Sequence, residues 1–252
     1  MTKMRPLIVG NWKMNLLNAD SAVLAFGITK KLNVMGDPGC EIIICPPFVA
    51  LKTVGEMIAD SQVSLGAQDC HTEEFGAYTG EISPKMLFDL GCEFVIVGHS
   101  ERRIYQKETN DLVSKKALIA KNSGLKPIIC VGETLDQRNT GQTLNVIEKQ
   151  IIASIPDEID STPTIIAYEP VWAIGSGETP TLEQITEVHK FIHGVLSSKV
   201  ADGSLVQILY GGSMNSQNSS EILSLDYVNG GLIGGASLTV DNFWSICTSC
   251  VK

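Results

Sequence analysis

Short apolar runs alternate along the chain with longer amphipathic stretches. Eight such runs predict strands: PLIVG (6–10), EIIIC (41–45), VSLGA (63–67), EFVIVG (93–98), KPIICV (126–131), TIIAY (164–168), VQILY (206–210) and DYVNG (226–230). Most are nearly continuous in Val, Ile and Leu, which is typical of strands buried on both faces of a parallel sheet.

The stretches between these runs carry helix start signals. Ser83 followed by Pro84 offers an N-cap with proline at the first helical position, and Thr181 with Gln184 has the spacing of a capping box. The repeating unit is a strand followed by a helix, and no linker or low-complexity tract interrupts the eight units. The pattern predicts one α/β domain over residues 1–252, either a closed (β/α)8 barrel or an open doubly wound sheet.

Composition narrows the possible partners. The 252 residues carry a formal net charge of -9, which argues against non-specific binding of nucleic acid or anionic membranes. No run approaches the roughly 20 apolar residues of a membrane span, and Asn11 and Lys13 interrupt the first apolar run too early for a signal peptide. Seven scattered cysteines, including the Cys247–Cys250 pair, are typical of reduced, inert thiols. We therefore expect a cytoplasmic enzyme.

In a barrel, reactive side chains lie where the strands end. Lys13 follows the first strand and could draw an anion into an acidic protein, although it could also be an ordinary solvated lysine. His99 follows the fourth strand and could donate to a carbonyl oxygen, or be structural. Glu169 ends the sixth strand and could act as a general base, or form a salt bridge there.

The segment after Glu169 predicts a lid. Pro170 is stiff, Val171–Ile174 is apolar, and Gly175 and Gly177 permit bending before Thr179 and Pro180. A segment with these properties could close over a site and exclude water.

Glycine-rich turns follow the last two strands. Gly211, Gly212 and Ser213 form one turn, and Gly234 and Gly235 form the other. Exposed backbone N–H groups in such turns bind phosphate, and barrels often place a phosphate site there, although glycines also serve tight turns alone. Neither turn has the sequence of a P-loop or of a dinucleotide-binding fingerprint.

No metal or cofactor is expected. His189 and His193 are four residues apart on a predicted helix, but Lys190 stands where a zinc protease of that pattern has its glutamate. Both histidines are therefore interpreted as surface or packing residues.

Seven motifs together resemble the triosephosphate isomerase family over essentially the whole chain. They are GNWKMN (10–15), GAYTGEIS (76–83), VIVGHSERR (95–103), CVGE (130–133), AYEPVWAIGSG (167–177), YGGS (210–213) and GGASL (234–238). The resemblance implies a (β/α)8 TIM barrel. It also implies interconversion of dihydroxyacetone phosphate and D-glyceraldehyde 3-phosphate through an enediolate, in glycolysis and gluconeogenesis, without cofactor or metal.

The resemblance also implies residue roles. Glu169 corresponds to the base, His99 to the electrophile, and Lys13 with Asn11 to the groups that bind and polarise the substrate. The phosphate-binding positions are Gly175, Ser213, Gly234 and Gly235, and Glu101 lies behind Lys13. The long Gln68–Glu81 loop implies a homodimer, in which Thr79 meets Asn11 of the second subunit.

Three positions depart from the family pattern. Asp69 stands where many members have Asn, Asn229 where Asp is common, and Ser176 where Thr is frequent. None is a predicted catalytic residue.

Two other functions are compatible with parts of this pattern. A retaining glycosidase would need a second carboxylate, such as Glu101, about 5–5.5 Å from Glu169. A barrel kept only as a binding or scaffold protein would tolerate loss of Lys13, His99 and Glu169, yet all three are present.

Overall fold

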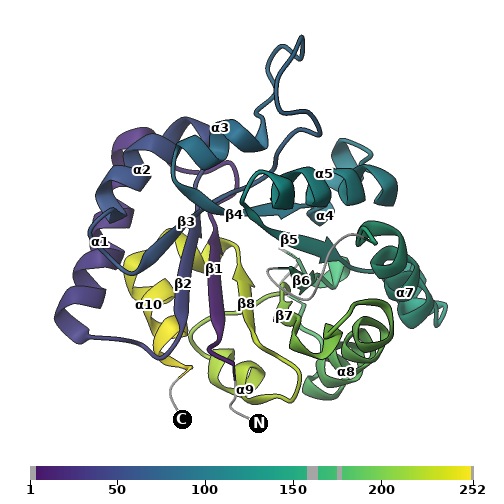
Figure 1. Cartoon of the computed structure of the whole chain (residues 1–252). Coiled ribbons are helices and arrows are strands. Elements are labelled where there is room, and N and C mark those ends of the chain that lie inside the picture. Colours follow the sequence, from purple (N-terminus) through teal and green to yellow (C-terminus); the bar gives the residue numbers. More distant parts are fainter. Residues whose placement is uncertain (1–3, 158–163, 175–177, 251–252) are drawn as a thin grey trace.

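Eight parallel strands close into a barrel in their sequence order (Figure 1). The computed structural model describes residues 4–157, 164–174 and 178–250. The strands are β1 (Leu7–Asn11), β2 (Glu41–Cys45), β3 (Val63–Ala67), β4 (Cys92–Val97), β5 (Lys126–Val131), β6 (Ile165–Tyr168), β7 (Gln207–Tyr210) and β8 (Gly230–Ile233). Because β1 pairs with both β2 and β8, the sheet has no edges. The alternative of an open sheet is therefore wrong.

Helices surround the barrel on its outer face (Figure 1). They are α1 (Asn18–Met35), α2 (Leu51–Ile58), α3 (Pro84–Asp89), α4 (Ser100–Tyr105), α5 (Asn110–Asn122), α6 (Leu135–Asn139), α7 (Thr143–Ser154), α8 (Leu182–Lys199), α9 (Ser219–Ser224) and α10 (Val240–Thr248). Short 3-10 segments in the described part of the chain add to these: η1 (Phe48–Ala50), η2 (Val171–Ala173), η3 (Gly203–Leu205) and η4 (Gly235–Leu238).

The two predicted helix starts are confirmed. The Ser83 hydroxyl accepts a hydrogen bond from the Met86 N–H, with Pro84 opening α3. Thr181 and Gln184 form a reciprocal capping box at the start of α8. In both cases the side chain satisfies a backbone donor that the first helical turn leaves unpaired.

The predicted eighth strand is misplaced. Of the predicted run 226–230, residues 226–229 form a connection, in which Tyr227 has a positive φ of 65°, and the strand begins only at Gly230. Gly230 has a φ of 147°, and a side chain there would place its Cβ 1.9 Å from the Leu7 carbonyl oxygen. Close contact with β1 thus requires glycine, and the glycine-rich sequence concealed the strand.

Asn229 joins β7 to β1 just before this strand. Its side-chain oxygen accepts from the Ile208 N–H at 2.9 Å, and its own N–H donates to the Ile208 carbonyl at 2.8 Å. Its carbonyl accepts from the Leu7 N–H at 3.0 Å. The amide side chain at this departure from the family pattern thus substitutes for missing ladder bonds between β7 and β8.

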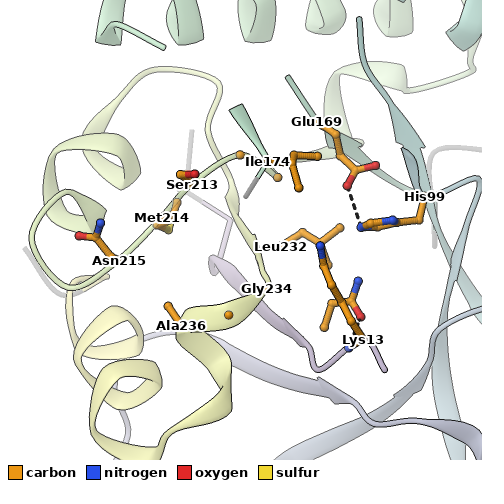
Figure 2. A pocket seen from close by; sticks show the side chains of 14 residues that line it. Lys13, His99, Glu169, Ile174, Ser213, Met214, Asn215, Leu232, Gly234 and Ala236 are labelled. Carbon is orange, nitrogen blue, oxygen red and sulfur yellow. Dashed lines mark hydrogen bonds and ion pairs between the residues drawn. The ribbon is translucent and has the colours of Figure 1, made fainter. Parts of the chain in front are cut away.

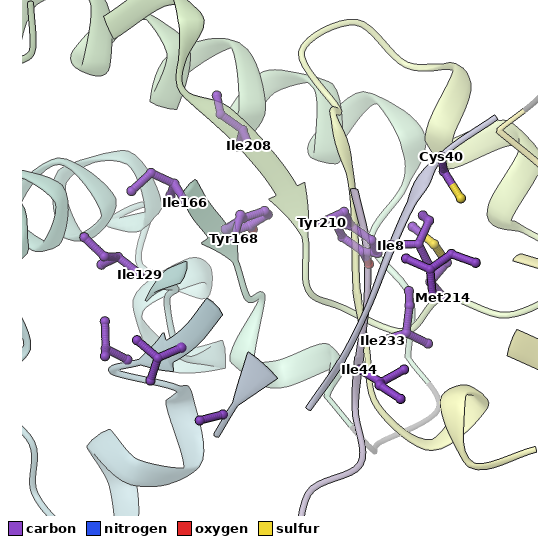
Figure 3. Close-up of a cluster of buried hydrophobic side chains, with 14 of the residues drawn as sticks. Ile8, Cys40, Ile44, Ile129, Ile166, Tyr168, Ile208, Tyr210, Met214 and Ile233 are labelled. Carbon is purple, nitrogen blue, oxygen red and sulfur yellow. The ribbon is translucent and has the colours of Figure 1, made fainter. Parts of the chain in front are cut away.

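The apolar core has two layers, because successive strand residues point to opposite faces. Side chains such as Val9, Ile43, Ile96 and Ile128 fill the barrel interior. Their neighbours, such as Ile8, Ile44, Ile129 and Ile208, pack between the strands and the helices (Figure 3). This double burial explains the nearly continuous apolar runs of the sequence.

Across residues 4–157, 164–174 and 178–250, no helix combines the length and the apolar character needed to cross a membrane.

Candidate active site

A cavity of about 300 Å³ opens at the carboxyl ends of the strands. Side chains from β1 and β8, residues that follow β1, β4 and β6, and the loops after β7 and β8 line it (Figure 2). Its lining residues are Asn11, Lys13, His99, Glu169, Ile174, Gly211, Gly212, Ser213, Met214, Asn215, Leu232, Gly234, Gly235 and Ala236. Every predicted site residue that the structure describes therefore lines this cavity, apart from Glu101. Glu101 is connected to the cavity through its ion pair with Lys13.

An unusual backbone conformation and an ion pair fix the position of Lys13. Its φ of 52° is unusual for a non-glycine residue, and its N–H donates to the Asn11 side-chain oxygen at 3.0 Å. Its Nζ lies 2.6 Å from Oε1 of Glu101, and Gln68 donates to its carbonyl at 2.8 Å. These contacts direct the ammonium group into the cavity.

His99 precedes α4 and caps its N-terminus. Its Nδ1 accepts from the Glu101 N–H at 3.2 Å, so the proton of a neutral ring lies on Nε2. Nε2 lies 2.9 Å from Oε1 of Glu169. Burial lowers the pKa of His99, but the adjacent Glu169 carboxylate outweighs burial and raises it above the ordinary value.

Glu169 follows β6 directly and is only 2% exposed. Its Oε2 accepts from the Ser100 N–H at 2.8 Å, at the first turn of α4. Burial raises the pKa of Glu169, but the contacts with His99 and the Ser100 N–H overcome this and lower it below the ordinary value. The carboxylate is thus ionised and shielded from solvent, as a general base requires.

Two glycines allow the backbone to approach Glu169 closely. A Cβ on Gly132 would lie 1.7 Å from the Glu169 carbonyl oxygen, and one on Gly211 would lie 2.9 Å from its Cγ. The Glu169 N–H also donates to the Val131 carbonyl at 2.7 Å. The loops after β5 and β7 therefore fix the position of this carboxylate.

The two glycine-rich turns face the opposite side of the cavity (Figure 2). A Cβ on Gly235 would meet nothing within 4 Å, and one on Gly234 would lie 3.4 Å from Cε of Lys13. Ser213 donates to the Ala173 carbonyl at 2.7 Å, which joins this wall to the segment after Glu169. Gly175, the fourth predicted phosphate-binding residue, lies outside the described residues.

Glu133 anchors the segment after Glu169. It is fully buried, and its Oε1 accepts from the Trp172 indole at 2.9 Å and the Tyr168 hydroxyl at 3.2 Å. Its backbone carbonyl accepts from the Val171 N–H at 3.0 Å. The sequence placed Glu133 at a strand end without indicating this role.

Several cavity residues were not predicted from the sequence. Ile174, Met214, Asn215, Leu232 and Ala236 complete the lining. Leu232 was hidden because the eighth strand was placed too early, whereas Ile174 was assigned to the apolar segment but not to the cavity wall.

The described residues contain no group of three or more His, Cys, Asp or Glu that could hold a metal ion. His189 is buried against Tyr168 and Tyr210, and the His193 ring contacts the Tyr227 ring at a tilt of 48°. Both are packing residues, as interpreted from the sequence.

Comparison with known proteins identifies the family. The family model described as "TIM: Triosephosphate isomerase" matches residues 6–250. The chain belongs to the triosephosphate isomerase family. The triosephosphate isomerase of Herminiimonas arsenicoxydans is 46% identical over 245 residues, which cover 96% of this chain and 98% of that protein. That of Magnetococcus marinus is 45% identical over 250 residues, covering 96% and 97%.

A solved structure supports the same family. The crystal structure of triosephosphate isomerase from Bartonella henselae superposes with a TM-score of 0.91 at 40% sequence identity, covering 99% of this chain and 100% of that one. The expected TIM barrel is confirmed. The expected isomerase, which interconverts dihydroxyacetone phosphate and D-glyceraldehyde 3-phosphate in glycolysis, is confirmed with it.

Proposed function

We propose that Glu169, His99 and Lys13 carry out the isomerisation. Glu169 takes a proton from one substrate carbon and returns it to the neighbouring carbon. His99 and Lys13 stabilise the negative charge that develops on the two oxygens of the enediolate. The observation that carries this proposal is the convergence of one dry carboxylate, one imidazole and one ammonium group on a single cavity (Figure 2).

His99 acts as a neutral hydrogen-bond donor. Its Nδ1 accepts a helical N–H from Glu101, and a proton on Nδ1 would replace this hydrogen bond with repulsion at the positive end of α4. Glu169 raises the pKa of His99 in the free enzyme. Transfer of the substrate proton to Glu169 removes that charge, and Nε2–H is then left to donate to the substrate.

Asn11, Ser213, Gly234 and Gly235 bind the phosphorylated substrate, and Gly175 is proposed to join them. Supporting observations are the open space beside Gly235 and the closeness of Gly234 to the Lys13 stem. Glu101 holds Lys13 in place at 2.6 Å.

The segment from Val171 to Gly177 is proposed to act as a lid. Ile174 already lines the cavity, and Ser213 and Glu133 hold the segment at Ala173 and Trp172. An apolar cover would exclude water and limit loss of phosphate from the enediolate.

A homodimer formed through the Gln68–Glu81 loop is also proposed. The segment between β3 and α3 stands away from the barrel (Figure 1), and Phe75 on it is 68% exposed. Met14, after β1, and Val49, in η1 after the neighbouring strand β2, are 95% and 85% exposed. Exposed apolar side chains of this kind on one face mark protein contacts. Light scattering should give twice the chain mass of 27.2 kDa, and a monomer would contradict the proposal.

A cytoplasmic location is proposed from the six buried cysteines, which are free thiols, because reduced thiols are typical of that compartment.

The catalytic roles are tested with purified protein and dihydroxyacetone phosphate in a coupled assay. Glu169→Gln should lower kcat by about 10²- to 10⁴-fold while keeping the binding of 2-phosphoglycolate, because only the base is removed. Glu148→Gln, a change at an exposed position of α7, is the matched control and should leave kcat unchanged. Full activity of Glu169→Gln would refute the assignment of the base.

A further inference from the structure

Arg103 is a partly buried cation at the back of the active site. Its Nε donates to the Gly98 carbonyl at 2.8 Å, and its Nη2 donates to the Cys130 carbonyl at 3.0 Å. Nη1 reaches the Asn110 side-chain oxygen at 2.7 Å, and Nη2 also reaches the Ser154 hydroxyl at 3.2 Å. All four acceptors are neutral, and no carboxylate of the described residues forms an ion pair with it.

The Gly98 carbonyl belongs to the turn that presents His99. Gly98 has a φ of 67°, and a Cβ there would lie 2.6 Å from Val113 and 3.1 Å from Nη2 of Arg103. The turn between β4 and α4 therefore closes around the guanidinium group. Its hydrogen bond fixes the peptide that immediately precedes the imidazole.

The Cys130 carbonyl belongs to the strand that supports Glu169. Cys130 pairs with Ala167 in the register of β5 with β6, and Gly132, two residues later, is in close contact with the Glu169 backbone. One guanidinium group thus joins the strand end that carries His99 to the strand that backs Glu169. Arginine suits this task because its planar donors point in fixed directions.

The charge of Arg103 also faces Glu169. Both residues line a second, smaller cavity of about 150 Å³ behind the carboxylate. Burial lowers the pKa of Arg103, and the negative charges of Glu169 and Glu108 offset part of that shift. An arginine remains protonated under such conditions, and a buried cation favours the ionised form of a nearby carboxylate.

We infer that Arg103 is a positioning residue for the reaction, which aligns His99 with Glu169 through the Gly98 and Cys130 carbonyls. It does not line the substrate cavity and touches no reacting atom. The inference rests on the roles proposed above for His99 and Glu169.

Two substitutions separate alignment from charge. Arg103→Lys keeps the charge but cannot donate in four fixed directions, whereas Arg103→Met removes both the charge and the donors. The matched control is Arg5→Met, because Arg5 also donates to a backbone carbonyl, that of Cys40 just before β2, at 2.8 Å, but lies before β1, at the opposite end of the barrel from the active site. Each protein is measured by circular dichroism, by kcat and KM, and by the pH profile of kcat/KM.

Misalignment by a fraction of an ångström lowers kcat more than it changes KM. Arg103→Lys should therefore lower kcat by about tenfold, and Arg103→Met by about 100-fold, with KM within about threefold of wild type. In Arg103→Met the acid limb of the pH profile should also move up by about half a pH unit or more, whereas Arg103→Lys should keep the wild-type limb. Arg5→Met should match wild type in all three.

The outcome is decisive even if Arg103→Met fails to fold, because wild-type kcat in Arg103→Lys would by itself overturn the inference. A folded Arg103→Met with wild-type kcat and an unchanged acid limb would also overturn it. Glu169→Gln is measured in the same assay. If Glu169→Gln is inactive while both Arg103 variants match wild type, only the role of Arg103 fails. If Glu169→Gln is fully active, the proposed catalytic roles fail, and this inference fails with them.

Discussion

Asp69 belongs to a buried cluster of four charges beneath the Gln68–Glu81 loop. Lys116 lies 2.7 Å from Asp69 and 2.6 Å from Glu108, and Arg102 lies 2.8 Å and 2.7 Å from the same two carboxylates. Burial raises the pKa of Asp69 to about 6, although Lys116 partly counteracts it. Burial also acts on Glu108, but its hydrogen bond with Lys116 leaves its pKa lowered. Of the two carboxylates that share these cations, Asp69 is therefore the one that takes up a proton.

The raised pKa of Asp69 determines how strongly the free energy of unfolding depends on pH. A rise from the ordinary 3.8 to about 6 corresponds to about 3 kcal/mol, since one pH unit is worth about 1.4 kcal/mol. The folded chain holds this proton more tightly than the unfolded chain does. The stabilisation is therefore complete below pH 3.8 and is lost as the pH rises through about 6. About 1.5 kcal/mol of the loss falls between pH 5 and pH 7.5.

Asp69→Asn should abolish this pH dependence, because an amide resembles the protonated acid at every pH. Urea unfolding of both proteins at pH 5 and pH 7.5, at one protein concentration, gives the double difference in free energy of unfolding. From pH 5 to pH 7.5, the free energy of unfolding of wild type should fall by about 1.5 kcal/mol more than that of Asp69→Asn. Asp60→Asn, at an exposed turn, serves as control and should show no such difference. A double difference of zero, or one of opposite sign, would refute the argument.

Three further predictions follow from the site and the core. Gly132→Ala should lower the free energy of unfolding by about 3 kcal/mol and reduce kcat, because its Cβ would meet the Glu169 carbonyl oxygen at 1.7 Å. Gly194→Ala, in α8 with open space around it, should instead raise the free energy of unfolding by about 0.5–1 kcal/mol in the same urea titration. The acid limb of kcat/KM should lie above the ordinary histidine value of 6.5, because kcat/KM reports the free enzyme, in which the Glu169 carboxylate outweighs burial and raises the pKa of His99, while the reaction needs the neutral ring; a limb below pH 5.5 would exclude that assignment. The six buried cysteines of the native protein should resist a thiol reagent; rapid reaction of several thiols would contradict the described packing.

The sequence predicted seven of the eight strands because parallel strands covered on both faces leave a simple record of continuous Val, Ile and Leu. The eighth strand left no such record. Gly230 and Gly231 are selected there for close backbone contact, so apolar patterning favoured the connection before it instead. Closure of the barrel also left no local pattern, because it depends on the pairing of β1 with β8 across more than 200 residues.

The candidate catalytic residues were predictable because each follows a strand directly, and the end of a parallel strand fixes where a side chain can lie. The contacts that orient these residues were not predictable. Ser100 acts through its backbone N–H, Arg103 through distant carbonyls and Glu133 through a carboxylate that accepts from Trp172, and residue type and spacing reveal none of these contacts. The buried pairing of Asp69 with Lys116 likewise joins segments 47 residues apart.

The first turn of α4 organises the whole site, although only His99 of this turn was predicted to act on the substrate. The Ser100 N–H holds Glu169, the Glu101 N–H orients the His99 ring, and the Glu101 carboxylate holds Lys13. Three catalytic side chains from three different strands thus share one short helical turn as a common reference. A displacement of this turn would misplace all three together. For this reason a cation such as Arg103, which anchors the turn to β5, is expected to affect the rate far more than its distance from the substrate would suggest.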